Sequence, residues 1–262
     1  MILIFYAFAR EVAPLKRRLK SRKPLDAGML RGFRVENGRS EFVFIASGMG
    51  PNRAGETVRA ACETYSGIEF ILSIGVAGAL SAGLKTGDII VANRIMSDTG
   101  EKVDVIECAQ AADRFESALR AAKIPFSAGA ILTSGTPLLD GREKRAAKER
   151  SGAIAVDMES AAIAAEALSR GIPFAVVRAI IDELEDEVFG ADLPDSEGNV
   201  GAGAVAAYFA RNPGAILRVP RMMVNLSRAT RALADAVEAL IVPSANETGR
   251  AGRTNRPTIR RR

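Results

Sequence analysis

The sequence contains no histidine and no tryptophan, and it has only two cysteines among 262 residues. Without histidine, the chain has no Ser-His-Asp triad, no Cys-His pair and no histidine metal ligand. Cys62 and Cys108 are too few for a structural zinc site within one chain, because such a site takes four ligands. Acid–base chemistry must therefore come from carboxylates, lysine, tyrosine or these two thiols.

Long uncharged apolar runs are also absent, and none reaches the roughly 20 residues needed to span a membrane. The apolar N-terminus, Met-Ile-Leu-Ile-Phe-Tyr-Ala-Phe-Ala, precedes its first positive charge at Arg10, which reverses the order of a signal peptide. The two cysteines lie far apart and lack a C-x-x-C spacing, which favours free thiols in a reducing compartment. We expect a first buried strand at the N-terminus and a cytoplasmic protein.

Positive charge is concentrated in one short segment. The chain has 36 basic and 31 acidic residues, a net charge of +5, but residues 249–262 contain six arginines and no acid. Removing those six leaves 30 basic against 31 acidic residues, so the rest of the chain is close to neutral. The composition of the segment favours a solvated, disordered tail. Contact with nucleic acid or an anionic membrane is the alternative, and nucleic acid is not the expected main partner.

The length and composition predict one domain followed by that tail. Apolar residues make up 48% of the chain and charged residues 26%, as in ordinary globular proteins. We expect a single domain over residues 1–245 and a disordered Arg-rich tail over residues 246–262.

Apolar strand-like runs alternate with amphipathic helical patterns, which predicts an α/β fold with a central mixed β-sheet flanked by helices on both faces. The expected strands are 2–8, 42–46, 70–75, 88–92, 128–132, 153–157 and 174–181; the expected helices are 10–22, 52–65, 111–122, 141–150 and 159–170. Glycine-rich or serine-rich turns follow three of the strands, at 47–50, 75–78 and 134–135. Because ligands bind at the carboxyl ends of strands in open α/β sheets, these turns are three candidate walls of one binding site. For any one of them alone, the alternative is a tight turn with only a structural role.

The pattern changes after residue 190. Residues 191–201 predict a long loop, residues 205–210 a short helix, and the stretch to about Leu240 a long helix bent near Pro220. Four arginines lie on the polar side of that stretch: Arg218, Arg221, Arg228 and Arg231. Packing against the sheet is the first interpretation, and weak contact of this basic helix with a membrane surface is the second.

Three segments carry carboxylates where strands end. Glu159 follows an apolar strand at the start of a helix, where a carboxylate can accept two hydrogen bonds from a vicinal diol such as ribose, with Met158 as an apolar surface beside the sugar. Asp182 ends an almost wholly apolar strand, where burial can keep the carboxyl protonated and able to donate to a base nitrogen. Glu11 follows the first strand and can activate water or hold a hydroxyl. The alternative for each is an acidic residue in a helical first turn or a turn cap.

Together these segments resemble the purine nucleoside phosphorylase/uridine phosphorylase superfamily, which includes the methylthioadenosine/adenosylhomocysteine nucleosidases. Six pieces match in order and spacing over about residues 1–185: Ala9-Arg10-Glu11-Val12, Ser47-Gly48-Met49-Gly50, Ile74-Gly75-Val76-Ala77-Gly78-Ala79-Leu80, Gly87-Asp88-Ile89-Ile90, Val156-Asp157-Met158-Glu159-Ser160-Ala161-Ala162 and the Arg178–Asp182 strand. The segment Ala210-Arg211-Asn212-Pro213-Gly214 and the helix after it resemble hopanoid-biosynthesis-associated nucleoside phosphorylases.

The resemblance implies a role for each matching residue. Asp182 would protonate N7 of a purine leaving group, Glu159 would bind the ribose hydroxyls with Met158 against the sugar, and Glu11 would activate water. The base pocket would include Ser134, Gly135, Leu138 and Leu139, and the small-residue wall beside the sugar would include Gly75, Ala77 and Gly78. No cofactor or metal is implied, apart from phosphate as co-substrate in a phosphorylase, and a homo-oligomer is expected.

Two departures from the family pattern affect the expected reaction and substrate. Ser73 and Val76 stand where hexameric phosphorylases carry arginine and threonine for phosphate, which favours hydrolysis, whereas Arg10 and Arg53 lie near other anion-binding positions of the family. Ile181 stands where nucleosidases commonly have a small polar residue, so the base pocket differs from theirs.

The sequence therefore predicts an enzyme that cleaves the N-glycosidic bond of a purine nucleoside, with a 5′-substituted adenosine hydrolysed to release adenine. Phosphorolysis of an adenosylhopane-type or other purine nucleoside is the second hypothesis. A nucleoside-binding protein that keeps the fold without activity is the third.

Overall fold

The computed structural model describes residues 1–25, 28–38, 40–98, 103–188, 211 and 217–241. The predicted loop at 191–201, the short helix at 205–210 and the tail at 246–262 lie outside these residues. Within the described part, each strand and each helix expected before residue 182 corresponds to an observed element.

The strands form one mixed sheet, as predicted: β1 (Ile2–Tyr6), β2 (Arg22–Pro24), β3 (Gly32–Asn37), β4 (Ser40–Ala46), β5 (Phe70–Ala79), β6 (Ile89–Asp98), β7 (Val103–Glu107), β8 (Phe126–Ser134), β9 (Ala155–Asp157) and β10 (Phe174–Asp182). The strand order is β10-β6-β8-β9-β5-β1-β4-β3-β2, and β7 pairs with β6. Because β10 also pairs with β5, the strands β5, β10, β6, β8 and β9 close into a ring. Strand β1 lies between β4 and β5 and runs parallel to both.

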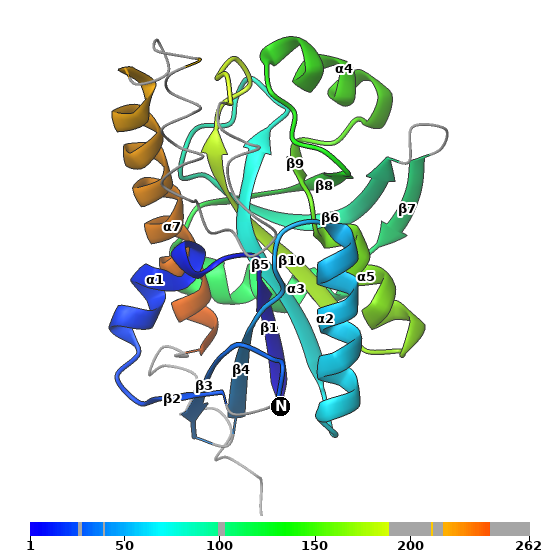
Figure 1. Ribbon diagram of the computed structural model, residues 1–262, viewed down its shortest axis with the longest axis vertical. Coiled ribbons are helices and arrows are strands. Elements are labelled where there is room, and N and C mark those ends of the chain that lie inside the picture. Colours follow the sequence, from blue (N-terminus) through cyan, green and yellow to red (C-terminus); the bar gives the residue numbers. More distant parts are fainter. Residues whose placement is uncertain (26–27, 39, 99–102, 189–210, 212–216, 242–262) are drawn as a thin grey trace, which may run out of the picture.

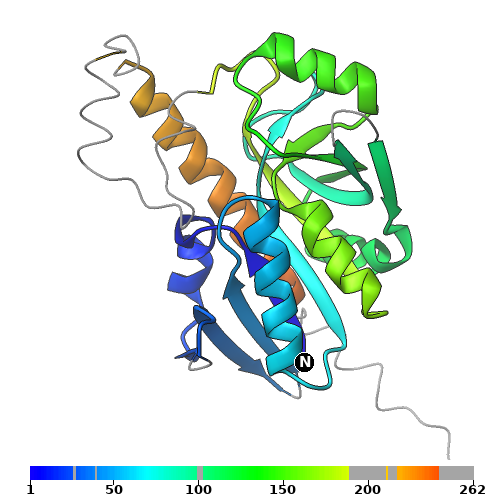
Figure 2. The ribbon, with the colours of Figure 1, turned by 45° about the vertical axis from the view of Figure 1, so that its right-hand side comes forward.

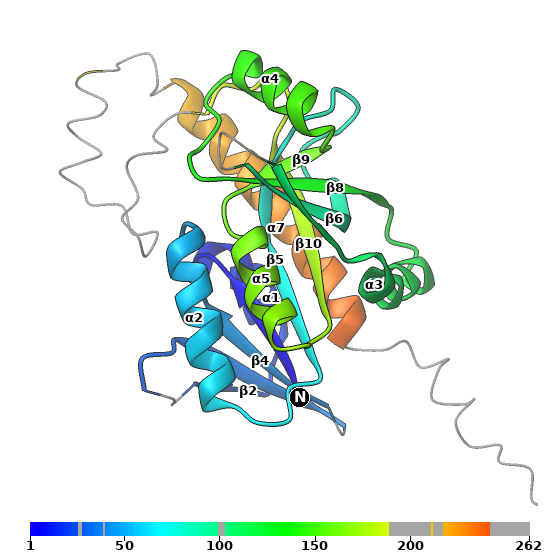
Figure 3. The ribbon, with the colours of Figure 1, turned by 90° about the vertical axis from the view of Figure 1, so that its right-hand side faces the viewer.

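Helices cover both faces of this sheet: α1 (Ala9–Arg18), α2 (Pro51–Thr64), α3 (Ala109–Ala121), α4 (Gly141–Ser151), α5 (Ser160–Ser169) and α7 (Val219–Ile241) (Figure 1). One apolar core joins the sheet to α1, α3 and α7, and a second joins it to α2 and α5. Figure 3 shows α2 and α5 on one side of β5 and α3 on the other, and Figure 1 shows α7 on the opposite side of β5 from α2 and α5. Strand β1 contributes to both cores, because its side chains alternate between the two faces.

Helices α2 and α5 lie side by side (Figure 2) and are joined by an ion pair in which Arg59 Nη2 lies 2.6 Å from Glu166 Oε1. On the opposite face, α7 buries Ala229, Leu233 and Val237 in the core. The interpretation that the C-terminal helix packs against the sheet is thus confirmed.

Three details of the predicted elements are wrong. Pro220 does not bend a long helix, because it lies in the first turn of α7, where no intrahelical N–H bond is lost. Helix α1 ends at Arg18 instead of residue 22, and Arg22–Pro24 forms the exposed strand β2 against β3. Strands β2, β3 and β7 were not expected, because their sequences lack long apolar runs and they form by pairing with neighbours.

Among the described helices, none combines the length and the apolar character needed to cross a bilayer.

Candidate active site

A cavity of about 160 Å³, called the main cavity below, lies where strands β1, β5, β9 and β10 end. Its lining combines apolar side chains with four carboxyl groups and one ammonium group. The described residues around it are Ala7, Phe8, Glu11, Met49, Val76, Ala77, Gly78, Thr136, Pro137, Leu138, Lys144, Val156, Asp157, Met158, Glu159, Ile181, Asp182 and Val188. The fold thus brings Glu11, Glu159 and Asp182, which are far apart in the sequence, onto one cavity.

Glu11 lies in the first turn of α1, and its carboxylate is held by backbone N–H groups. Oε2 accepts from Ala7 N at 2.7 Å and from Phe8 N at 3.2 Å, and Oε1 accepts from Val76 N on β5 at 3.0 Å. Burial raises the pKa of Glu11, whereas the N–H donors and the Arg178 charge act in the opposite direction. The carboxyl is therefore fixed in orientation by three backbone donors, and its burial favours the uptake of a proton.

A glycine on β5 makes room for that carboxylate. A Cβ at Gly75 would lie 2.6 Å from Glu11 Oε1, well inside van der Waals contact. Gly75 is thus required by the close approach of the Glu11 carboxylate and not by a turn.

Glu159 directly follows β9 and caps the start of α5. Its Oε1 accepts from Gly50 N at 2.7 Å, which ties it to the turn before α2. Burial and the nearby Asp157 carboxylate raise the pKa of Glu159 to about 7. Met158 lines the same cavity beside it.

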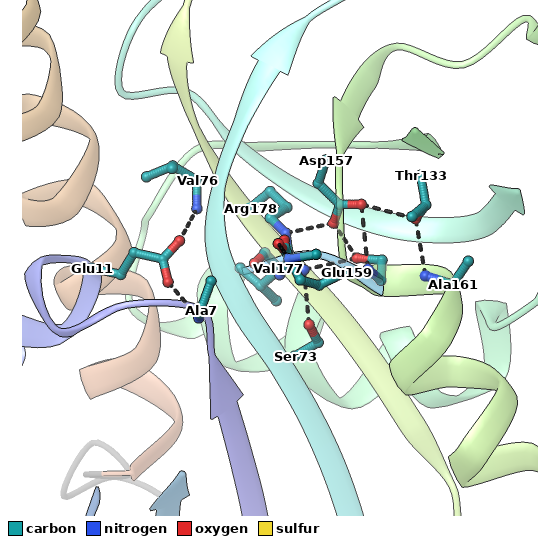
Figure 4. A network of polar contacts seen from close by, with 12 residues as sticks. Ala7, Glu11, Ser73, Val76, Thr133, Asp157, Glu159, Ala161, Val177 and Arg178 are labelled. Atoms are coloured by element: carbon teal, nitrogen blue, oxygen red, sulfur yellow. Dashed lines mark hydrogen bonds and ion pairs between the residues drawn. The ribbon is translucent and has the colours of Figure 1, made fainter. Parts of the chain in front are cut away.

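A buried polar network centred on Arg178 lies beside the two glutamates (Figure 4). Arg178 on β10 donates from Nε to Asp157 Oδ2 at 2.8 Å and from Nη2 to the hydroxyls of Ser73 and Ser160, each at 2.8 Å. Asp157 Oδ1 accepts from the Thr133 hydroxyl at 2.9 Å. This network fixes the floor of the site, because nearly every partner is buried and paired.

A second, polar cavity of about 10 Å³ adjoins the first and shares Ala7, Glu11 and Glu159 with it. Ser47, Ser73 and Arg178 also line it. That volume matches a single water molecule, and the lining offers several hydrogen-bonding groups, as a bound water requires.

Asp182 ends β10 at the other side of the main cavity, where its Oδ2 accepts from the Lys144 ammonium of α4. Burial raises the pKa of Asp182, and the Lys144 charge and hydrogen bond oppose that rise. A Cβ at Gly78 would lie 2.9 Å from Asp182 Oδ2, so this position of β5 also needs a residue without a side chain.

Other residues singled out in the sequence divide into two groups. Ala77, Gly78, Met158 and Leu138 line the main cavity. Among the described residues, its lining does not include Ser134, Gly135, Leu139, Arg10 or Arg53.

The residues outside the cavity have other positions. Leu139 is 46% exposed, Arg10 is exposed on α1, and the Ser134 hydroxyl donates to Thr136 O at 2.7 Å. Arg53 lines a neighbouring groove of about 470 Å³ that also contains Arg31, Ser47 and Gly48.

Sequence reasoning missed two charged residues of the site. Arg178 was part of a matched segment but had no role, although an arginine inside an apolar strand is a signal of a buried ion pair. The sequence around Lys144 gives no comparable indication of burial, because this lysine lies in the charged run Gly-Arg-Glu-Lys-Arg. Only its spacing of three residues from Gly141 and Ala147, which are buried with it, indicates an inward direction.

No group of three or more Cys, Asp or Glu side chains within the described ranges is arranged to hold a metal ion.

Comparison with known proteins gives consistent findings. The family model of the phosphorylase superfamily matches residues 1–209. A 5′-methylthioadenosine/S-adenosylhomocysteine nucleosidase of Colwellia psychrerythraea is 27% identical over 204 residues, which covers 68% of this chain and 82% of the relative.

Two solved structures share the fold at lower identity. The 5′-methylthioadenosine/S-adenosyl homocysteine nucleosidase of Campylobacter jejuni superposes with a TM-score of 0.71 at 18% identity, covering 91% of this chain and 97% of that one. Futalosine hydrolase of Helicobacter pylori superposes with a TM-score of 0.69 at 19% identity, covering 92% and 96%.

Proposed function

The chain belongs to the phosphorylase superfamily, as the sequence resemblance indicated, and we propose that this enzyme hydrolyses the N-glycosidic bond of a purine nucleoside. The observation that carries the proposal is that Glu11, Glu159 and Asp182 line one cavity, with a water-sized polar cavity beside the two glutamates. One carboxyl serves the leaving base, one the sugar and one the attacking water.

The bond-breaking step uses Asp182 and Glu159. The bond between C1′ and N9 breaks, its electron pair moves into the purine, and Asp182 gives a proton to N7. The sugar becomes positively charged at C1′, and the Glu159 carboxylate, which accepts hydrogen bonds from the ribose hydroxyls, stabilises that charge. Met158 packs against the sugar face.

The bond-forming step uses Glu11. A water molecule in the small cavity attacks C1′ through its oxygen and transfers a proton to the Glu11 carboxylate. The products are the neutral base and the free sugar. Glu11 then holds one proton and Asp182 has lost one, and exchange with solvent restores both.

Hydrolysis is favoured over phosphorolysis by the groups around the small cavity. Ser73, which stands at a phosphate-binding position of the family, accepts from Arg178. The two arginines predicted to hold phosphate, Arg10 and Arg53, lie outside the lining of the main cavity. Arg53 and Arg31 in the neighbouring groove support phosphorolysis as the second candidate.

The proposed substrate is a 5′-substituted adenosine of the methylthioadenosine or adenosylhomocysteine type, with adenine as product. Relatives at about a quarter identity that are named for these two nucleosides support this choice. A lipid-linked, adenosylhopane-type nucleoside is the alternative.

We also propose a cytoplasmic homo-oligomer. Weak membrane contact is supported by exposed Leu217, Met223 and Val224 beside Arg218 and Arg221 at the start of α7.

Chromatography of adenine and the sugar product, with and without phosphate, tests the proposal on methylthioadenosine and adenosylhomocysteine. We expect adenine and free sugar at equal rates in both buffers. A sugar phosphate formed only with phosphate would establish the second candidate. Nucleoside binding without any product, also with an adenosine carrying a lipid 5′ group, would indicate the inactive binding protein.

A further inference from the structure

Lys144 is a buried lysine whose side chain is only 1% exposed. It lies in the first turns of α4, and its ammonium group reaches the end of β10, 38 residues later in the chain. A buried ammonium group is costly unless charged and polar partners surround it, so its position needs an explanation.

Each of its three N–H donors has an acceptor. One hydrogen bond goes to Asp182 Oδ2, one to Glu183 O at 2.7 Å and one to Asp186 O at 3.0 Å. The two carbonyl groups hold the ammonium in place independently of the carboxylate. The Lys144 ammonium, held by these two carbonyl groups, thus sets the direction of the Asp182 side chain.

The start of α4 is built to bring Lys144 there. Asp140 caps the helix by accepting from Glu143 N at 2.8 Å. A Cβ at Gly141 would lie 2.7 Å from Glu185 Oε2 and 3.1 Å from Leu184 O, so glycine lets the segment after β10 approach the helix. Arg145 adds an ion pair to Glu185 in the same contact.

We propose that Lys144 is the positioning residue for the acid that protonates the leaving base: it occupies Oδ2 of Asp182 and leaves Oδ1 for the purine. This inference rests on the proposed function. In the described part of the chain, Asp182 Oδ1 has no hydrogen-bond partner, and both residues line the main cavity.

Among the charged groups around Asp182, Lys144 acts most strongly on its proton. Lys144 faces it from α4, and the Asp186 carboxylate, which pairs with Arg221 of α7, faces it from the following segment. The neighbouring wall residues Gly78 of β5 and Val156 of β9 carry no charge. Burial raises the pKa of Asp182, and the Lys144 charge and hydrogen bond act in the opposite direction.

The test is the pH profile of kcat/KM for the purine nucleoside, measured on wild type, Lys144→Met and Lys148→Met. Lys148 lies one turn further along α4, and within the described residues its ammonium group donates to Gly152 O and to no other group, so it is the matched control. The rate must fall at alkaline pH as Asp182 loses its proton. We expect Lys144→Met to move that alkaline limb upward by about one pH unit and to lower kcat/KM at pH 7 about 10-fold. Lys148→Met should leave both unchanged.

If Lys144→Met lowers the rate but leaves the alkaline limb at its wild-type pH, the proposal is overturned. That result is expected of a lysine whose role is only structural. If Lys144→Met does not fold, Lys144→Gln removes the charge and keeps N–H donors for the carbonyl groups, and the same shift is expected. Lys144→Arg, which keeps the charge, should hold the limb near its wild-type position. Absence of nucleoside cleavage by wild type would instead reject the proposed function itself.

Discussion

The two ends of the main cavity hold their carboxyl groups in different ways. At the sugar end, Glu11 and Glu159 accept from backbone N–H groups, and the Arg178–Asp157 pair supports them from below. At the base end, Asp182 is held by one side chain, Lys144. The sugar end is therefore fixed by backbone groups, whereas the base end depends on a contact between α4 and β10 that one substitution can remove.

The proposed reaction requires opposite protonation states at the two ends. Glu11 and Glu159 must be ionised to accept protons and hydroxyl groups, although burial raises the pKa of both. Asp182 must be protonated, and burial raises its pKa as well. Burial therefore has opposite consequences at the two ends. It favours protonation of Glu11 and Glu159, which should lower activity at acid pH, and it favours the protonated Asp182 that the reaction needs.

The largest effect is expected at the sugar end from Glu11→Gln. The amide cannot take the proton of the attacking water, so kcat should fall about 1,000-fold. Steady-state kinetics measures the change, and Glu63→Gln on the exposed face of α2 is the control. Turnover within a few fold of wild type would remove Glu11 from the role of water activator.

Asp182→Asn should lower kcat about 100-fold on a purine nucleoside, because asparagine donates a hydrogen bond but no proton. A 4-nitrophenyl riboside leaves without protonation, so its cleavage by the same variant should change by less than about 5-fold. Equal losses on the two substrates would contradict the role of Asp182 at the base and point to a general defect.

Glu159→Gln should change how stability depends on pH. The pKa of Glu159 is about 7 in the folded state and near 4.5 when unfolded, so its contribution to stability is complete below pH 4.5 and is lost as pH rises through 7.

The glutamine variant should not show that loss. Its free energy of unfolding, relative to wild type, should be about 3 kcal/mol higher at pH 8 than at pH 4.5 by the value of a pKa unit. Urea unfolding at the two pH values measures it, and an unchanged difference would mean that Glu159 is not buried as described.

A smaller effect is expected from Gly75→Ala. The added Cβ would meet Glu11 Oε1 at 2.6 Å and displace the carboxylate, which should lower kcat about 10-fold with a smaller change in KM. Gly83→Ala is the control, because a Cβ at Gly83 would meet no atom within 4 Å beyond its chain neighbours. Full activity of Gly75→Ala would show that the position of Glu11 is not critical.

The sequence predicts the sugar end better than the base end. Glu11, Glu159 and Asp182 each follow an apolar strand beside small residues, and the strands determine where they meet. Strands β2 and β7 and the support for Asp182 depend on contacts between distant segments. Lys144 is the clearest case, because a lysine in a charged helix looks solvent-exposed until the packing of Gly141 against the end of β10 is known.

The pH profile of kcat/KM for wild type and Asp182→Asn tests the contrast between the two ends most directly. For wild type, we predict a bell-shaped profile. Its acid side should fall as Glu11 and Glu159 take up protons, and its alkaline side should fall as Asp182 loses one. In Asp182→Asn, the acid side should remain and the alkaline fall should disappear. An alkaline fall that persists in this variant would contradict the assignment of the two ends.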